Sequence, residues 1–119
     1  MDMRTLKEIN LDTIQQLALK ELYNRLQNQF RIDELILFGS AVRGEADEES
    51  DIDVLVISEE HISRKQRHRI SDLALEVNLK YNTNISTVVV NRKDWETGPI
   101  SVLPFHYNVI REGVKIEEL

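Results

Sequence analysis

A strand, a tight turn and a second strand that opens on two carboxylates constrain this chain more than any other feature. The apolar run that ends at Leu37-Phe38 is broken by Gly39-Ser40. Ten residues later, Asp51 and Asp53 open the apolar segment Val54-Leu55-Val56-Ile57. Residues i and i+2 of a strand point to the same face, so both aspartates are expected to face one site.

Two neighbouring carboxylates repel each other, so a cation is their natural partner. Mg²⁺ takes oxygen ligands and usually arrives with phosphate groups. The Gly-Ser turn can offer backbone N–H groups and a hydroxyl to those phosphates. The pattern therefore predicts a phosphate cradle beside a metal-binding pair, although an acidic surface loop next to an ordinary strand would also fit. A calcium loop of the EF-hand kind does not fit, because Ile52 stands where that loop needs glycine.

Length and composition limit the classes of protein to which this chain can belong. A chain of 119 residues is expected to form one domain, and 41% hydrophobic with 30% charged residues is typical of a soluble globular protein. Neither a membrane-spanning apolar run nor a secretory signal is expected, which favours a cytoplasmic location. Without cysteine, disulfides and thiolate metal sites are excluded. The net charge of −6 argues against non-specific binding to nucleic acid.

Hydrophobic spacing predicts helices and strands in alternation. Helices are expected over residues 11–30 (capped by Asn10 or Asp12), over residues 64–81 (opened by a Ser63/Gln66 capping box) and over residues 105–111. Strands are expected over residues 33–38, 51–58 and 85–90, a fourth near residues 114–116, and a helical turn over residues 40–43. This alternation predicts an α/β (α+β) fold in which helices pack against a small mixed sheet.

The strand–turn–strand segment resembles the DNA polymerase β-like nucleotidyltransferase superfamily, and the likeness is specific over residues 33–58. The chain is most similar to the minimal nucleotidyltransferases of bacteria and archaea, small proteins often encoded beside a HEPN-domain protein. The resemblance implies the polymerase β-like palm fold. The matching residues are Gly39, Ser40, Arg43, Gly44, Ser50, Asp51 and Asp53.

The same resemblance implies roles for these residues. Asp51 and Asp53 would be the catalytic pair and would hold two Mg²⁺ ions. Gly39 would let the backbone approach the phosphates, and Ser40 would hold the terminal ones. An exposed turn residue is an equally good interpretation of Arg43. The implied nucleotide-binding set is Gly39, Ser40, Arg43 and Ser50.

The implied reaction transfers a nucleoside monophosphate to a hydroxyl and releases pyrophosphate. ATP is the favoured substrate, with another nucleoside triphosphate as the alternative. The resemblance points to a partner protein as the acceptor, such as a HEPN-type toxin, which would make this chain an antitoxin. Small metabolites remain alternative acceptors. The base preference, the number of nucleotides added and the oligomeric state, a homo-oligomer included, are left open.

The chain departs from the family at the third carboxylate that active members usually carry on the next strand. Residues 84–90 contain no Asp or Glu, and the aligned position holds Asn84 or, as second choice, Ser86. Asp94 could substitute, but a helix cap before Trp95 is the favoured interpretation. Loss of a carboxylate should weaken catalysis more than nucleotide binding. The alternative hypothesis is therefore a nucleotide-binding protein that neutralises its partner by contact alone.

The remaining polar and aromatic residues predict no second site. His61, His68 and His106 are expected to be exposed or partly packed, and the basic run over residues 64–69 is expected to be a solvated helix face. Trp95 and Tyr107 could stack on a base, but packing in a core or an interface is more common for such residues.

Overall fold

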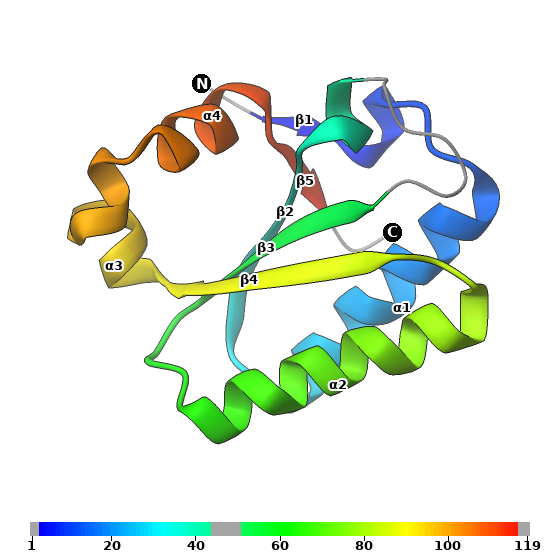
Figure 1. Ribbon diagram of the computed structural model, residues 1–119, viewed down its shortest axis with the longest axis horizontal. Coiled ribbons are helices and arrows are strands. Elements are labelled where there is room, and N and C mark those ends of the chain that lie inside the picture. The colour runs from blue at the N-terminus through cyan, green and yellow to red at the C-terminus, as the bar shows by residue number, and fades with distance from the viewer. Residues whose placement is uncertain (1–2, 44–50, 117–119) are drawn as a thin grey trace.

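A computed structural model of the protein describes residues 3–43 and 51–116, which form helices packed on one mixed sheet (Figure 1). The strands are β1 (Arg4–Thr5), β2 (Ile32–Phe38), β3 (Ile52–Ser58), β4 (Ile85–Asn91) and β5 (Val114–Ile116). The helices are α1 (Thr13–Gln29), α2 (Arg64–Tyr81), α3 (Arg92–Thr97) and α4 (Pro104–Glu112), with short 3-10 helices η1 (Leu6–Glu8), η2 (Ser40–Arg43) and η3 (Pro99–Val102).

The sheet has the strand order β1-β5-β2-β3-β4. Central β2 runs antiparallel to β3 and to β5, whereas β4 runs parallel to β3 and β1 runs parallel to β5. Helix α2 makes the crossover that joins the parallel strands β3 and β4, because such a pair cannot be joined by a tight hairpin. The predicted α/β (α+β) class with a small mixed sheet is confirmed.

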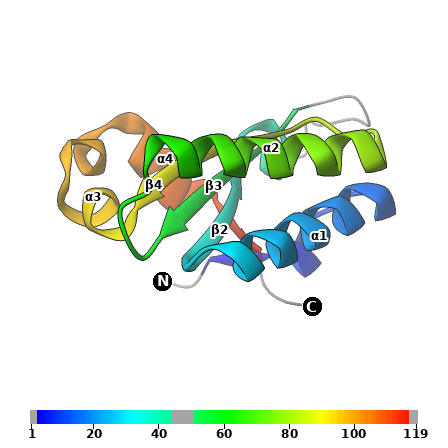
Figure 2. The same cartoon turned by 90° about the horizontal axis from the view of Figure 1, so that it is seen from below.

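The two faces of the sheet are covered differently. Helices α1 and α2 pack side by side on one face, as Figures 1 and 2 show from two directions. Leu22 of α1 and Ile70 of α2 are fully buried there against Val54 of β3. On the second face, α3, η3 and α4 place Trp95 and Val109 over Leu55. The second face is the one towards which Asp53 points, because Asp53 and Leu55 are two residues apart on β3.

The helix caps follow from local sequence. Of the two candidates for α1, the structure selects Asp12, whose Oδ1 accepts a hydrogen bond from the N–H of Gln15 at 2.7 Å. The predicted capping box that opens α2 is confirmed, because Ser63 and Gln66 exchange side-chain to backbone hydrogen bonds. Asn91, and not Asp94, caps α3: its Oδ1 accepts from the N–H of Asp94 at 2.8 Å.

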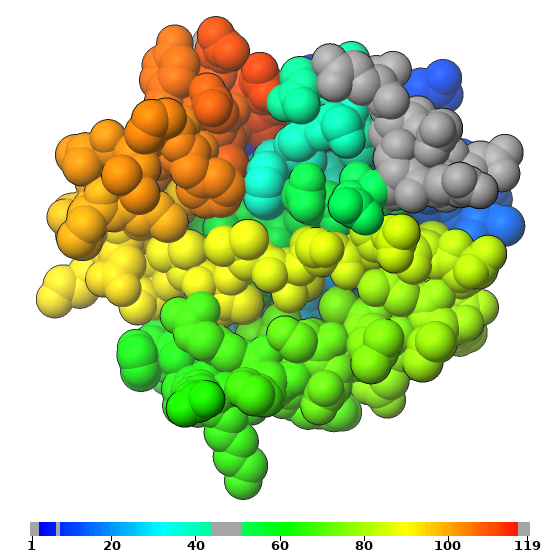
Figure 3. Space-filling model, in the orientation of Figure 1, coloured from blue at the N-terminus to red at the C-terminus, as the bar shows by residue number. Residues whose placement is uncertain are grey.

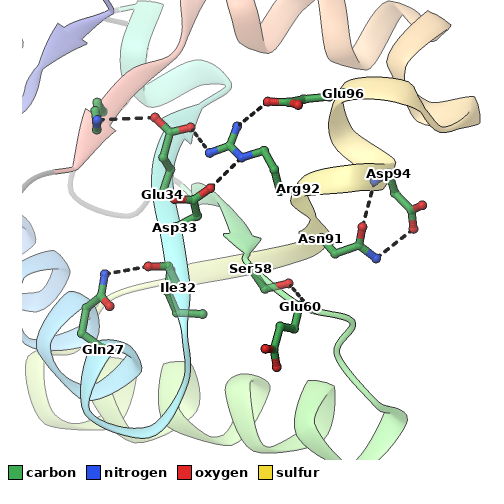
Figure 4. Close-up of polar contacts among 11 residues, drawn as sticks. Gln27, Ile32, Asp33, Glu34, Ser58, Glu60, Asn91, Arg92, Asp94 and Glu96 are labelled. Atoms are coloured by element: carbon green, nitrogen blue, oxygen red, sulfur yellow. Dashed lines mark hydrogen bonds and ion pairs between the residues drawn. The ribbon is translucent and has the colours of Figure 1, made fainter.

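An ion-pair network fixes α3 to the sheet at the end remote from Asp53 (Figure 4). Arg92, which begins α3, donates from Nη2 to Glu34 Oε2 at 2.6 Å and from Nε to Asp33 Oδ2 at 2.7 Å. Both carboxylates come from the start of β2, so the network ties the helices of the second face to the central strand. None of the helices in residues 3–43 and 51–116 is long and apolar enough to cross a membrane.

Candidate active site

The structure places Asp51 and Asp53 at the start of β3, on the sheet face that α4 only partly covers. Asp53 is the register partner of Phe38 on β2 and of Ser86 on β4, so it lies in the middle of three strands. Its side chain is half-buried, whereas Asp51 is exposed. The alternation along β3 puts both carboxylates on the same face, as the sequence predicts.

Gly39, just past the end of β2, lines the β2 side of this site. It follows Phe38 directly and has a φ of +82°, a conformation that glycine adopts without strain. A Cβ built on Gly39 would lie 2.5 Å from Asp53 Oδ2, closer than any real contact. The turn and the carboxylate are therefore in direct apposition, and a side chain at position 39 would displace the Asp53 carboxylate from this position.

The carboxylate pair carries unbalanced negative charge. Burial raises the pKa of Asp53 above its usual value, and the charge of Asp51 adds to this shift. A hard cation bound between the two would neutralise that charge, so the residues fit a divalent metal ion. Within the described part of the chain, no cluster of three or more His, Asp or Glu side chains could hold a metal by itself. Further ligands would come from phosphate oxygens and water, as is usual for Mg²⁺.

Helix η2 carries the rest of the predicted phosphate-binding turn. Its Ala41 and Val42 are buried in the main core, which anchors the turn, and the N–H of Val42 donates to the carbonyl of Gly39 at 3.2 Å. Ser40, which begins η2, directly follows Gly39 and is half-exposed. Ser50 lies outside the described residues, as does Gly44.

Arg43 extends from the same turn and forms an ion pair that the sequence pattern does not predict. Its Nη1 lies 3.3 Å from Oε2 of Glu112, the last residue of α4. Arg4 adds a second link, because its Nη2 donates to the carbonyl oxygens of Val42 and Glu112 at 3.4 and 3.1 Å. The turn and the end of α4 are thus held together beside the carboxylates.

Strand β4 forms the third side of the site and offers neutral groups. Ser86 is the register partner of Asp53, and Asn84 lies two residues before it, with its carbonyl accepting from the N–H of Ile52 at 2.8 Å. Asn78 of α2 fixes this end of β4, because its side chain bonds both the N–H and the carbonyl of Ile85. The register thus sets Ser86, more directly than Asn84, beside Asp53.

Asp94 is not part of this site. It follows the far end of β4, which spans seven residues from Ile85 to Asn91, roughly 20 Å at about 3.3 Å per residue. Trp95 is buried and stacks on His106 with 4.2 Å between ring centroids, so its role is packing. Tyr107, by contrast, is 62% exposed.

The chain belongs to the nucleotidyltransferase domain family, whose model matches residues 19–112. The fold and the strand–turn–strand segment thus define an enzyme of the nucleotidyltransferase class, as the resemblance implied.

Two candidate protein adenylyltransferases of Methanocaldococcus jannaschii are among its relatives. One is 36% identical over 104 residues, which is 81% of this chain and 91% of the relative. The other is 40% identical over 62 residues, which is 52% of this chain and 63% of the relative.

Solved structures share the fold at 17% sequence identity. One is a toxin–antitoxin complex with AMP-PNP, with a TM-score of 0.59 over 82% of this chain and 70% of that chain. Another is a candidate nucleotidyltransferase of Sulfolobus solfataricus, with a TM-score of 0.54 over 84% and 77%. A third is the tri-AMPylated HEPN toxin of Shewanella oneidensis in complex with its MNT antitoxin, at 0.53 over 85% and 70%. These likenesses concern the fold alone.

Proposed function

We propose that this protein is a Mg²⁺-dependent adenylyltransferase that moves AMP from ATP to a hydroxyl of a partner protein. The observation that carries the proposal is the apposition of Gly39 and the Asp53 carboxylate, which joins a phosphate-binding turn to a metal-binding pair. The names of the archaeal relatives support a protein acceptor.

In the proposed reaction, the acceptor oxygen bonds to the α-phosphorus of ATP while the bond from that phosphorus to the bridging oxygen breaks. Pyrophosphate leaves, and the hydroxyl proton passes to solvent. When bound by Asp51 and Asp53, Mg²⁺ would neutralise charge on the phosphate oxygens. The Gly39-Ser40 turn binds the phosphates through its backbone and the Ser40 hydroxyl, and Arg43 adds a positive charge close to them.

The proposed acceptor is a HEPN-type protein from the same genome, and the biological role is that of an antitoxin. One solved structure with the same fold is a toxin–antitoxin complex with AMP-PNP, and another is a tri-AMPylated HEPN toxin in complex with its MNT antitoxin. That observation supports the partner as a proposal for this chain.

The decisive experiment supplies α-phosphate-labelled ATP and Mg²⁺ to the purified HEPN-type protein. Wild type should label it, and Asp51→Asn/Asp53→Asn should not. A matched control, Asp72→Asn/Asp94→Asn, removes two carboxylates elsewhere on the surface and should label like wild type. Absence of label with wild type and every nucleoside triphosphate would refute transfer to this acceptor.

A second candidate function, inhibition of the partner by contact alone, is favoured by the neutral side chains of β4. Ser86 and Asn84 can orient a hydroxyl but are poor bases, so chemistry at this site should be slow. Ser86→Asp would restore a carboxylate beside Asp53, and we expect it to raise the transfer rate more than Asn84→Asp does. If neither wild type nor Ser86→Asp transfers a nucleotide while wild type still inhibits the partner, contact is the function.

A further inference from the structure

A cavity of about 610 Å³ opens where the start of α1 meets the loop between α2 and β4. Its lining comes from the cap and first turn of α1 and from residues 81–84, which join α2 to β4. Sites for small molecules usually have volumes of about 300–1,000 Å³, so this cavity is large enough for a nucleoside. We call it the α1–β4 pocket.

The α1–β4 pocket adjoins the metal-binding pair. Ile52 of β3 and Ile85 of β4 are register partners. One residue earlier on both parallel strands, Asn84 in the pocket wall lies beside Asp51, at the spacing of neighbouring strands, about 4.8 Å. The N–H of Ile52 donates to the carbonyl of Asn84 at 2.8 Å, which holds the two strand starts together. A ligand bound at Asp51 can therefore extend into the pocket.

The position of the phosphate-binding turn directs a nucleoside towards this pocket. Strand β3 lies between β2 and β4, and Figure 3 shows its green surface between the cyan surface of β2 and the yellow surface of β4. Phosphates held by the turn lie on the β2 side, so the nucleoside extends from the α-phosphate away from β2. Beyond Asp53 the sheet face is closed, because Leu55 is fully buried in the cluster that contains Trp95. The open direction leads to the strand starts, where the pocket lies.

The acceptor hydroxyl needs a different approach. In an in-line displacement, the attacking oxygen lies opposite the leaving pyrophosphate. That line runs from the turn across Asp53 to Ser86, its exposed register partner on β4. The α1–β4 pocket lies off this line, at the end of the sheet beside α1. It therefore suits the nucleoside better than the acceptor.

The lining of the pocket matches an uncharged, flat group. It contains no Lys, Arg or His among the described residues, so it would not hold a phosphate. Its carboxylate is engaged, because Asp12 caps α1 through the N–H of Gln15. Ile14 is 54% exposed and offers an apolar surface to the face of a base. The ring of Tyr81 forms a second wall, fixed by the hydrogen bond that its hydroxyl donates to Glu21 at 2.9 Å.

Two asparagines give the pocket a means of selecting a base. Asn82 and Asn84 are exposed, and neither side-chain amide forms a hydrogen bond within the part of the chain that the structure describes. An asparagine amide can form two hydrogen bonds with adenine, one to the amino group and one to a ring nitrogen. Guanine is usually read by Arg or Lys, and the lining has neither.

We infer that the α1–β4 pocket binds the adenine base of the nucleoside triphosphate and that Asn82 and Asn84 select this base. The inference rests on the proposed function, because the base reaches the pocket only when the phosphates lie on the turn and the metal-binding pair. It gives Asn84 a role in base selection, distinct from that of the carboxylate that the family carries near this position.

The test measures the binding of Mg²⁺–nucleotides to the full chain by titration calorimetry. The ligands are the four nucleoside triphosphates and inorganic tripolyphosphate, which probes the phosphate and metal site without a base. The pocket variant is Asn82→Gly/Asn84→Ala, because glycine keeps the φ of +55° at position 82 without strain. Asn24→Ala/Asn28→Ala removes two exposed amides elsewhere on α1 and is the matched control. Thermal melting checks that both variants fold.

We expect wild type to bind ATP at least tenfold more tightly than GTP, CTP or UTP. The pocket variant should lose this preference, while its affinity for tripolyphosphate stays within twofold of wild type. The control variant should keep the preference. Equal affinity of wild type for the four nucleotides, or an unchanged preference in the pocket variant, would overturn the inference.

Photo-labelling of wild type decides the question if the pocket variant does not fold. An ATP analogue with a photo-reactive azide on the adenine ring should mark residues 12–15 or 81–84, located by mass spectrometry of the peptides. Marking confined to residues 104–112 of α4 would place the base elsewhere and overturn the inference.

Failure of the proposed function gives a different result. If wild type transfers nothing but prefers ATP, and the pocket variant loses that preference, the base site stands and only the transfer reaction fails. If the pocket variant transfers AMP with an unchanged KM for ATP but a raised KM for the acceptor, the pocket holds the acceptor and the inference is overturned.

Discussion

Gly39→Ala is expected to reduce the activity of the candidate active site far more than it reduces the stability of the fold. Alanine at a φ of +82° destabilises the folded state by about 1–2 kcal/mol. For a chain of this size, that corresponds to a melting temperature lower by about 3–10 °C. The new Cβ would also lie 2.5 Å from Asp53 Oδ2, and the carboxylate, as the free end of a short side chain, would move away. A displacement of this kind should reduce transfer about 100-fold.

The assay measures thermal melting in EDTA, Mg²⁺-dependent binding of a fluorescent ATP analogue, and transfer. Gly39→Asn is the informative comparison, because asparagine tolerates positive φ but still carries a Cβ. It should melt close to wild type and yet bind Mg–ATP as poorly as Gly39→Ala. Unchanged Mg²⁺-dependent binding by both variants would refute the idea that Gly39 leaves the space that Asp53 needs.

Three further predictions concern single residues. Burial and the charge of Asp51 raise the pKa of Asp53, so ionisation of Asp53 destabilises the folded state. This destabilisation is absent at pH values below the ordinary pKa of 3.8 and complete at pH values above the raised pKa. In EDTA, Asp53→Asn should therefore melt above wild type at pH 7 but not at acidic pH, and a pH-independent difference would contradict this. Glu112→Gln should bind ATP about two- to fivefold more tightly in a fluorescence titration, because it removes the ion pair between Glu112 and Arg43 and leaves the Arg43 charge for the phosphates. The gain is small because a surface ion pair contributes at most about 1 kcal/mol. Weaker ATP binding by this variant would contradict the prediction. Arg92→Ala should lower the free energy of unfolding by about 1–3 kcal/mol in urea titrations without changing ATP affinity, because it removes the charge-assisted hydrogen bonds to Asp33 and Glu34 and leaves Glu34 with Lys115 alone.

The local elements could be predicted from the sequence because their signals lie within a few residues. The Ser63 capping box, the helical turn after Gly39 and the strand near residues 114–116 are examples, and all are confirmed. Strand β1 was not predicted, since two residues show no periodicity.

Contacts between distant residues could not be predicted in this way. Arg43 and Glu112 are 69 residues apart, and Arg92 and Glu34 are 58 apart. No spacing rule links such positions, because the packing of α4 and α3 on the sheet brings them together. The register between β3 and β4 depends on the same long-range packing, so the sequence alone does not show that Ser86 is the neighbour of Asp53.

The side chain that fixes the start of β4 also has a consequence for aggregation. Strand β4 ends the sheet order, and an uncovered edge strand is a template for adding strands from other chains. The Asn78 side chain forms hydrogen bonds with both the N–H and the carbonyl of Ile85, and Arg67 donates to the carbonyl of Val89 at 2.8 Å. Two side chains of α2 thus block the strand at both ends, so the same helix that orders the site also protects the sheet from edge-to-edge growth.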